Sequence, residues 1–404
     1  MALVILGITL WYYVIRIKRC KSRERFILNA ALCLYVGFTF ALNLFQKVSL
    51  QWEYGVPGVD MEAYFKGANA LSNGFPLNQL GKVDFRLAMN ISNIGYLLYV
   101  LFVMVVVFTP IIIYPMVTLY ICYIIQCIIA IISVLNITEF LTKGRDKARR
   151  HILITMLMCV CFMQASAVLM RDIWIVFIIS LLMQCLIGKR IPHILCVVLI
   201  LLAGIIRVYT LVVTVPLYIC YIGSKKLAVI ASVMISILLI AGSTLLDQIA
   251  GIYKILWQYN YKIKIDEILQ YFLFPNIINQ TYNIFHIETG YHASFGGNNT
   301  LIYYMLSVWN ILVYPLLAYG IICVIREKRY GDLAIWGLMI LNISLLYCVF
   351  YEGVSEPRHK LLIIYALMYF SSEGLSRMRK STYIVWCQTV IIFALGCILT
   401  VSLF

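Results

Sequence analysis

Apolar runs long enough to cross a lipid bilayer recur along almost the whole of this 404-residue chain. A hydrocarbon core of roughly 30 Å takes about 20 apolar helical residues. Backbone N–H and C=O groups find no water at that depth, so such continuous runs must be helical. Barrel strands would be shorter and would alternate apolar with polar residues. The sequence therefore predicts an all-α, polytopic transmembrane helical bundle with one integral membrane domain over residues 1–404.

We expect about twelve spans, at residues 2–17, 26–46, 112–138, 151–169, 173–188, 193–206, 208–222, 227–246, 301–324, 333–351, 360–372 and 384–404. The apolar region 93–109 is expected to lie along the surface or to re-enter the bilayer. A full crossing there would place the basic run 143–150 opposite the other basic connectors, against the positive-inside rule. Two long outer segments follow from this topology, residues 47–111 and residues 247–300.

The same topology explains the formal net charge of +15. Essentially all of the excess lysine and arginine falls in the connectors on one side, where anionic lipid attracts it. The expected partner of this charge is therefore the lipid bilayer and no nucleic acid. The 13 cysteines are scattered through apolar runs, without metal-type spacing. They indicate packing rather than disulfides or zinc.

Acidic residues gather in the first outer segment, most closely in Asp60-Met61-Glu62-Ala63-Tyr64. A carboxylate held beside an apolar bundle can serve as a general base for an attacking hydroxyl. The alternative is a solvated loop carboxylate. We favour a functional role for Asp60 and solvation for Glu62 and Asp84.

Later apolar runs are interrupted by isolated charges at Arg171-Asp172, Arg207, Arg358 and Lys360. All of them are expected at helix ends on the same outer side as Asp60. Arginines there suit a phosphate or pyrophosphate group, which they bind by paired hydrogen bonds. The alternatives are a turn with snorkelling charges for Arg171-Asp172 and ordinary loop charges for Arg358 and Lys360. Arg207 has no acidic neighbour in sequence and must find a partner in space.

The segment that starts at Asp60 and Tyr64 and continues through Ala68, Leu71 and Gly74 resembles the first outer loop of the GT-C superfamily of integral-membrane glycosyltransferases. The segment 169–172 resembles the second-loop acidic motif of protein O-mannosyltransferases and lipid A aminoarabinose transferases. The segment 358–363 resembles their late arginine-led segment, although it has no proline. The hydropathy also resembles that of bacterial surface-polysaccharide polymerases.

This resemblance implies a GT-C-like fold and an inverting transferase in the bacterial inner membrane. Such an enzyme moves a sugar or oligosaccharide from a polyprenyl-phosphate-linked donor to a glycan, lipid or protein acceptor on the extracytoplasmic face. It implies Asp60 as general base, with Glu62 as fallback, and Asp172 as an aid to acceptor or phosphate geometry. The substrate- and phosphate-binding set would be Arg171, Arg207, Arg358, Lys360 and Tyr64.

The residues show no metal-binding pattern, and the cofactor is unknown, with a divalent cation left open. A polytopic bundle with buried charge also suits a transporter or flippase for a lipid-linked sugar or polysaccharide. The long acidic first segment favours an enzyme over that alternative.

Overall fold

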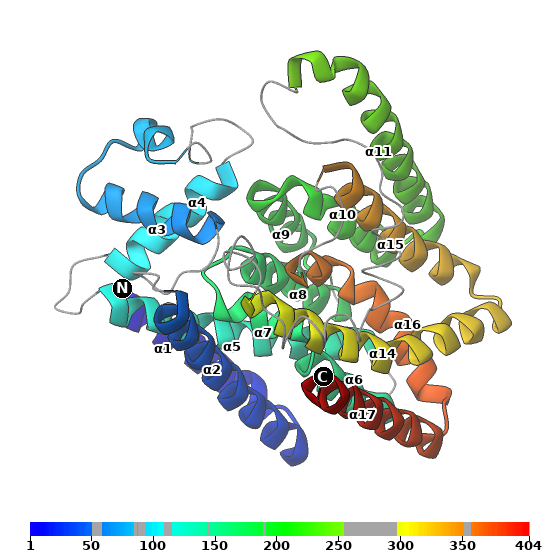
Figure 1. Ribbon diagram of the computed structural model, residues 1–404. Coiled ribbons are helices and arrows are strands. Elements are labelled where there is room, and N and C mark those ends of the chain that lie inside the picture. Colours follow the sequence, from blue (N-terminus) through cyan, green and yellow to red (C-terminus); the bar gives the residue numbers. More distant parts are fainter. Residues whose placement is uncertain are drawn as a thin grey trace.

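The computed structural model describes residues 1–50, 59–84, 87, 94–108, 115–143, 146–188, 191–253, 297–350 and 357–403. Every regular element in these ranges is helical, which confirms the all-α expectation (Figure 1). Residues 254–296, which make up most of the second long outer segment, lie outside the described residues.

The long helices occur wherever a span is expected. They are α1 (Ala2–Lys18), α2 (Ser22–Leu50), α3 (Val59–Ser72), α4 (Ile94–Val103), α5 (Pro115–Leu141), α6 (Asp146–Leu157), α7 (Val160–Ala167), α8 (Asp172–Ile187), α9 (His193–Ile206), α10 (Leu211–Ile222), α11 (Lys225–Tyr253), α14 (Gly297–Arg326), α15 (Tyr330–Phe350), α16 (Ile364–Arg377) and α17 (Lys380–Leu403). Four short turns join them: Leu77–Lys82, Met104–Phe108, Val208–Thr210 and Pro357–Leu362, the last labelled η7.

Length and composition support a membrane protein. Within the described residues, four helices are long and apolar enough to cross a bilayer: Ser22–Leu44, Val117–Leu141, Tyr304–Arg326 and Lys380–Leu403. The pair α6 and α7, bent by 47°, gives a fifth span if the two are taken together. Further apolar helices, among them α8, α9 and α10, are shorter. The twelve-span count therefore stays a prediction.

Helix α5 forms the centre of the bundle and packs against α1, α2, α7 and α8. A smaller cluster of buried residues joins α3, α4 and the start of α1. In Figure 1, α3 and α4 lie at the upper left, away from the α14–α15 and α16–α17 connections on the right. The 93–109 region thus contains a short helix packed between α3 and α9.

The break between α6 and α7 leaves no carbonyl of the last turn of α6 without a donor. A helix end exposes four such carbonyls, and in lipid each must be satisfied within the protein. The Ile154 carbonyl accepts from the Met158 amide (2.9 Å), and the Met156 carbonyl accepts from the Cys159 amide (3.1 Å). The Thr155 carbonyl accepts from Trp309 Nε1 (2.8 Å), and the Leu157 carbonyl accepts from the Tyr35 hydroxyl (2.9 Å). The break is therefore held by α2 and α14.

Two ion-pair groups tie together the helix ends that bear basic connectors. In the first, Glu139 of α5 accepts from Arg16 of α1 (2.6 Å) and Arg149 of α6 (3.1 Å). In the second, the buried Glu373 of α16 binds Arg329 (2.8 Å) and Arg377 (2.5 Å). We call this side of the bundle the basic end; it includes the α1–α2, α5–α6, α14–α15 and α16–α17 connections.

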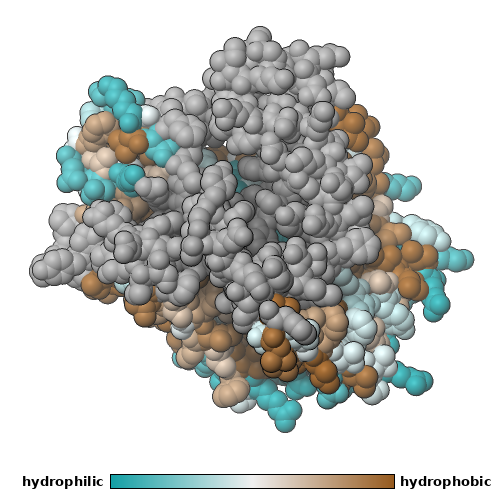
Figure 2. Space-filling view, viewed as in Figure 1, coloured by the Kyte–Doolittle hydropathy of each residue, from teal (hydrophilic) through white to brown (hydrophobic). Residues whose placement is uncertain are grey.

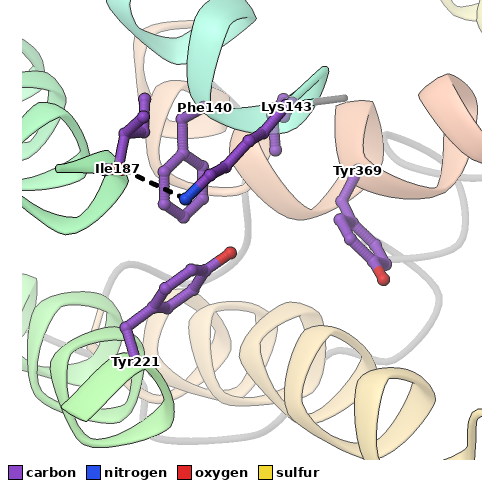
Figure 3. Close-up of a pocket in the computed structure, with 6 residues that line it drawn as sticks. Phe140, Lys143, Ile187, Tyr221 and Tyr369 are labelled. Atoms are coloured by element: carbon purple, nitrogen blue, oxygen red, sulfur yellow. Dashed lines mark hydrogen bonds between the residues drawn. The ribbon is translucent and has the colours of Figure 1, made fainter. Parts of the chain in front are cut away.

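A small cavity of about 130 Å³ lies at the basic end, among Phe140, Leu141, Lys143, Ile187, Tyr221 and Tyr369. The Lys143 ammonium donates to the Ile187 carbonyl (3.1 Å), and the Tyr221 hydroxyl points toward that ammonium (Figure 3). The cavity thus lies between α16 and the last turns of α5, α8 and α10.

The described surface is apolar over much of its area. Figure 2 shows hydrophobic residues over the flanks, with hydrophilic residues at the margins and around α3 at the upper left. Ile194, Leu238 and Ile392 are among the large aliphatic side chains that are more than half exposed. Lipid is the environment in which such side chains are stable.

Helices α14 and α16 cross with their backbones in contact. A Cβ atom at Gly320 would overlap the Phe370 carbonyl oxygen, and one at Gly374 would overlap the Leu316 carbonyl oxygen. Small residues permit this approach between membrane helices, where van der Waals packing replaces the hydrophobic effect. Gly374 directly follows the buried Glu373, so the crossing also fixes the position of that carboxylate.

We expect Gly374→Ala to lower the free energy of unfolding by about 1–3 kcal/mol, since the two helices must separate to admit a methyl group. Gly337→Ala is the matched control, because a Cβ in that α15 position meets no atom within 4 Å. The control should be neutral or stabilise by up to about 1 kcal/mol. Denaturant unfolding in detergent micelles measures both, and equal effects of the two variants would contradict the crossing.

Candidate functional site

Arg171, Asp172 and Arg207 meet where the α7–α8 and α9–α10 connections lie side by side. Asp172 Oδ1 is 3.2 Å from Arg207 Nη1, and the two side chains are 10% and 5% exposed. This contact supplies the spatial partner that the sequence required for Arg207. Burial of Arg171 and Asp172 also excludes the interpretation that both charges snorkel to solvent.

Local backbone geometry places these three residues at helix ends. Helix α7 stops at Val168, which is extended (φ −123°, ψ 148°), and Asp172 opens α8. A carboxylate in the first turn of a helix interacts favourably with the helix dipole. Arg207 is also extended (φ −151°, ψ 112°), and its carbonyl accepts both the amide and the hydroxyl of Thr210. The break after α9 is thereby satisfied within the chain.

Arg171 binds two different groups with its guanidinium. Its Nη1 donates to the Ile206 carbonyl (3.2 Å), which lies at the last residue of α9. Its Cζ stands 3.9 Å from the centroid of the Tyr96 ring. A desolvated cation over an aromatic face is stabilised by about 2 kcal/mol or more. Gly95 permits this arrangement, because a Cβ there would overlap the Ile206 oxygen and lie 2.8 Å from Arg171 Nη1.

Tyrosines connect the arginine cluster to α3. The Tyr64 ring of α3 lies 5.5 Å from the Tyr96 ring and 4.7 Å from the Tyr99 ring, centroid to centroid. The Tyr99 hydroxyl accepts from Gln126 Nε2 (3.1 Å), which also donates to the Met170 carbonyl (3.3 Å). Tyr64, predicted as a binding residue, is therefore part of the same packed group as Arg171.

Asp60 and Glu62 occupy different faces of α3. Their side chains lie outside the described residues, but both positions are helical. Position 60 precedes Tyr64 by one turn, and residues four apart share a face. Position 62 shares its face with the exposed Lys66 and Asn69. The helix thus places Asp60 on the face that carries the buried Tyr64, and Glu62 on the exposed one.

The two late basic residues, Arg358 and Lys360, both belong to η7. Lys360 is buried in η7, which packs against α7 and α8. The side chain of Arg358 lies outside the described residues, although its backbone belongs to the same turn.

Several buried polar atoms of the cluster have no hydrogen-bond partner among the described residues: Asp172 Oδ2, Arg171 Nε and Gln126 Oε1. Buried polar groups usually find a partner, and those that do not point to a bound water, an ion or a functional role. The three atoms offer two acceptors and one donor. No group of three His, Cys, Asp or Glu residues within the described ranges could hold a metal ion.

Sequence analysis missed three members of this site, namely Gly95, Tyr96 and Gln126. Tyr96 and Tyr99 lie in an apolar run, where aromatic residues are typical of packing. The available signal was a glycine followed by two tyrosines three residues apart in an otherwise aliphatic segment. Gln126 likewise interrupts the apolar run of α5, and an amide buried in a span usually has a partner.

Comparisons with protein-family models, with curated proteins and with solved structures find no match for this chain. The chemistry of the site therefore has to be judged from its own side chains. The resemblance to GT-C enzymes stays a prediction.

We expect the Asp172–Arg207 pair to show strong coupling in a double-mutant cycle. Breaking a buried ion pair by removing one partner costs about 3–5 kcal/mol, and removing both costs less than the sum of the two single losses. The single variants Asp172→Asn and Arg207→Gln and their combination, unfolded in micelles, measure this. The coupling should exceed about 1 kcal/mol.

The matched control is Lys225 and Asp332, which are 2.6 Å apart with the lysine side chain 58% exposed. A surface pair of this kind is worth about 0–1 kcal/mol. Equal coupling in the two cycles would show that the site pair is not desolvated as the structure indicates.

Proposed function

We propose that this chain is a membrane glycosyltransferase that transfers a sugar or oligosaccharide from a polyprenyl-phosphate-linked donor to an acceptor. The observation that carries the proposal is the meeting, at one end of an apolar bundle, of two buried arginines, a buried aspartate and the face of α3 that holds position 60. Such a site combines phosphate binding, a candidate base and a lipid environment.

The arginines suit the leaving group of this reaction. A lipid phosphate gains negative charge as its bond to the sugar breaks, and preorganised guanidinium groups in a dry site stabilise that charge. Arg207 is oriented by Asp172, and Arg171 is oriented by Tyr96 and the Ile206 carbonyl. Arg171 Nε is available for a phosphate oxygen, and Asp172 Oδ2 for a sugar hydroxyl.

Asp60 is the proposed general base. The acceptor hydroxyl oxygen attacks the anomeric carbon, its proton passes to the Asp60 carboxylate, and the bond from that carbon to the phosphate oxygen breaks. The electron pair leaves with the lipid phosphate. A single displacement of this kind inverts the configuration at the anomeric carbon. A base must reach the attacking hydroxyl, and α3 is the amphipathic helix whose buried face adjoins the arginine cluster.

The remaining parts of the proposal concern the setting. We place the site on the extracytoplasmic face of a bacterial inner membrane, because the basic connectors lie at the other end of the bundle and would face the cytoplasm. A GT-C-like arrangement with about twelve spans is part of the same proposal. The acceptor is a glycan, lipid or protein, and α4 is proposed to border the groove for it or for the donor lipid.

A lipid-linked sugar transporter or flippase is the second candidate, favoured by the broken pair α6 and α7. Discontinuous helices often bind substrates in transporters through freed backbone groups. In this chain, however, Tyr35 and Trp309 already occupy the exposed carbonyls of the break. The break therefore has a structural explanation, which favours the enzyme.

Reconstituted protein supplied with a radiolabelled polyprenyl-phosphate sugar tests the proposal. We expect Asp60→Asn to reduce transfer by about 10²–10⁴-fold, the usual contribution of a positioned base. Glu62→Gln is the matched control, because it removes an equal charge two residues away, at a helical position that does not share a face with position 60. It should keep transfer within about threefold, because the proposal gives the base role to Asp60 alone.

Full transfer by Asp60→Asn would reject Asp60 as the base. Movement of the labelled lipid across the vesicle membrane, without any new glycosidic bond, would replace the enzyme with the flippase.

A further inference from the structure

A second basic site lies at the basic end, between the first turns of α2 and α6. Its lining residues define what we call the basic groove: Ser22, Arg23, Phe26, Ile27, Arg150, His151 and Ile154. The groove is open to the outside and has a volume of about 500 Å³. It shares no residue with the arginine cluster of the candidate site.

The groove lies at the depth where lipid headgroups are expected. The candidate span of α2 begins at Ser22, and that of the α6–α7 pair begins at Ala148. Arg23 and Arg150 therefore stand in the first turn of each span, where the hydrocarbon region meets the headgroups. The residues that follow them, Phe26 and Ile154, extend toward the hydrocarbon.

The cations of the groove differ from their sequence neighbours in how they are used. Arg149 pairs with Glu24 (3.2 Å) and with Glu139, inside the bundle. Among the described residues, no acid pairs with Arg23 or Arg150, the residues that adjoin this inner pair. Arg149 is thus neutralised inside the bundle, whereas Arg23 and Arg150 contribute their positive charge to the groove.

Further positive charge surrounds the groove. Both Arg150 and Lys380 act on His151 electrostatically, so the start of α17 adds a cation to those of α2 and α6. A concave surface with one sign of charge concentrates ions of opposite charge. The groove is therefore suited to an anion.

An apolar wall adjoins these cations. Phe26 is 74% exposed and Ile154 is 40% exposed. A free anion would gain nothing from such side chains, whereas an acyl chain attached to the anion would cover them. Basic pockets between membrane helices on the cytoplasmic side are typical sites for anionic headgroups.

We propose that the basic groove binds an anionic phospholipid, with its phosphate on Arg23 and Arg150 and its acyl chains along Phe26 and Ile154. The cavity beside Lys143 is less suited to this role, because its ammonium already donates to the Ile187 carbonyl. The proposed lipid is separate from the glycosyl donor. The two sites lie at different ends of the bundle: Gln184 of α8 contacts the Glu139 group at the basic end, and Asp172 at the start of α8 belongs to the arginine cluster. Gln184 and Asp172 are twelve helical residues apart, or about 18 Å along α8.

Titration of the purified full chain in detergent with phosphatidylglycerol or phosphatidylcholine tests this proposal. Each basic residue near an anionic surface contributes on the order of a fivefold gain in affinity. We expect Arg23→Gln/Arg150→Gln to weaken phosphatidylglycerol binding by roughly 25-fold and to leave phosphatidylcholine binding unchanged. Arg23→Lys/Arg150→Lys keeps the charge and should retain most of the affinity, which controls for loss of fold.

The matched control is Lys226→Gln/Arg326→Gln, which removes two exposed charges from the same end of the bundle but outside the groove. It should leave phosphatidylglycerol affinity within about twofold, since screened charges beyond a Debye length of roughly 8–10 Å act weakly. An equal loss in both double variants would overturn the proposal in favour of general charge attraction.

Phe26→Ser tests the acyl-chain part. It should weaken phosphatidylglycerol binding while the groove keeps its charge. Displacement of the lipid by millimolar inorganic phosphate would instead show a site for soluble anions and overturn the lipid assignment. Transfer activity is not read in these titrations, so their result is independent of the glycosyltransferase proposal.

Discussion

The constraint on which the structure depends is that polar groups inside an apolar bundle must find their partners within the protein. Helices satisfy this requirement along their length, but every break in a helix reopens it. At the α6–α7 break the repair comes from Tyr35 and Trp309, and at the end of α9 it comes from Arg171 and Thr210. Tyr35, Trp309 and Arg171 reach these carbonyls from distant parts of the chain, and for that reason they fix which helices are neighbours.

The same need for internal partners explains how the buried charges of the molecule are paired. At the basic end, Glu139 and Glu373 each collect two arginines and hold several helix ends together. At the other end, Asp172 collects only Arg207 within the described residues and keeps one oxygen without a partner. Both carboxylate oxygens of Glu139 and of Glu373 are paired, which is typical of structural roles, whereas a buried carboxylate with an unpaired oxygen is more typical of a functional site. The distinction supports locating chemistry at Asp172 rather than at Glu373.

Sequence predicted the all-α class correctly, because long apolar runs leave few alternatives in lipid, whereas only four or five of the described helices are long and apolar enough to cross a bilayer. It also predicted that Arg207 needs a partner. It could not identify Asp172 as that partner, because the two residues are 35 positions apart and no local rule sets their distance in space. Tyr96 was missed because an aromatic ring in an apolar run looks like packing. Asp60 and Glu62 could be separated by helical position only once the buried face of α3, marked by Tyr64, was known.

Arg171 has a consequence that extends beyond its charge. Its guanidinium holds the end of α9 through the Ile206 carbonyl and the start of α4 through Tyr96. A ligand that draws this guanidinium away competes with both contacts, so its binding and the docking of α4 are thermodynamically linked. Such linkage is reciprocal: whatever moves α4 also changes the affinity for the ligand. The packing of α4 against α9 is therefore coupled to whatever Arg171 binds.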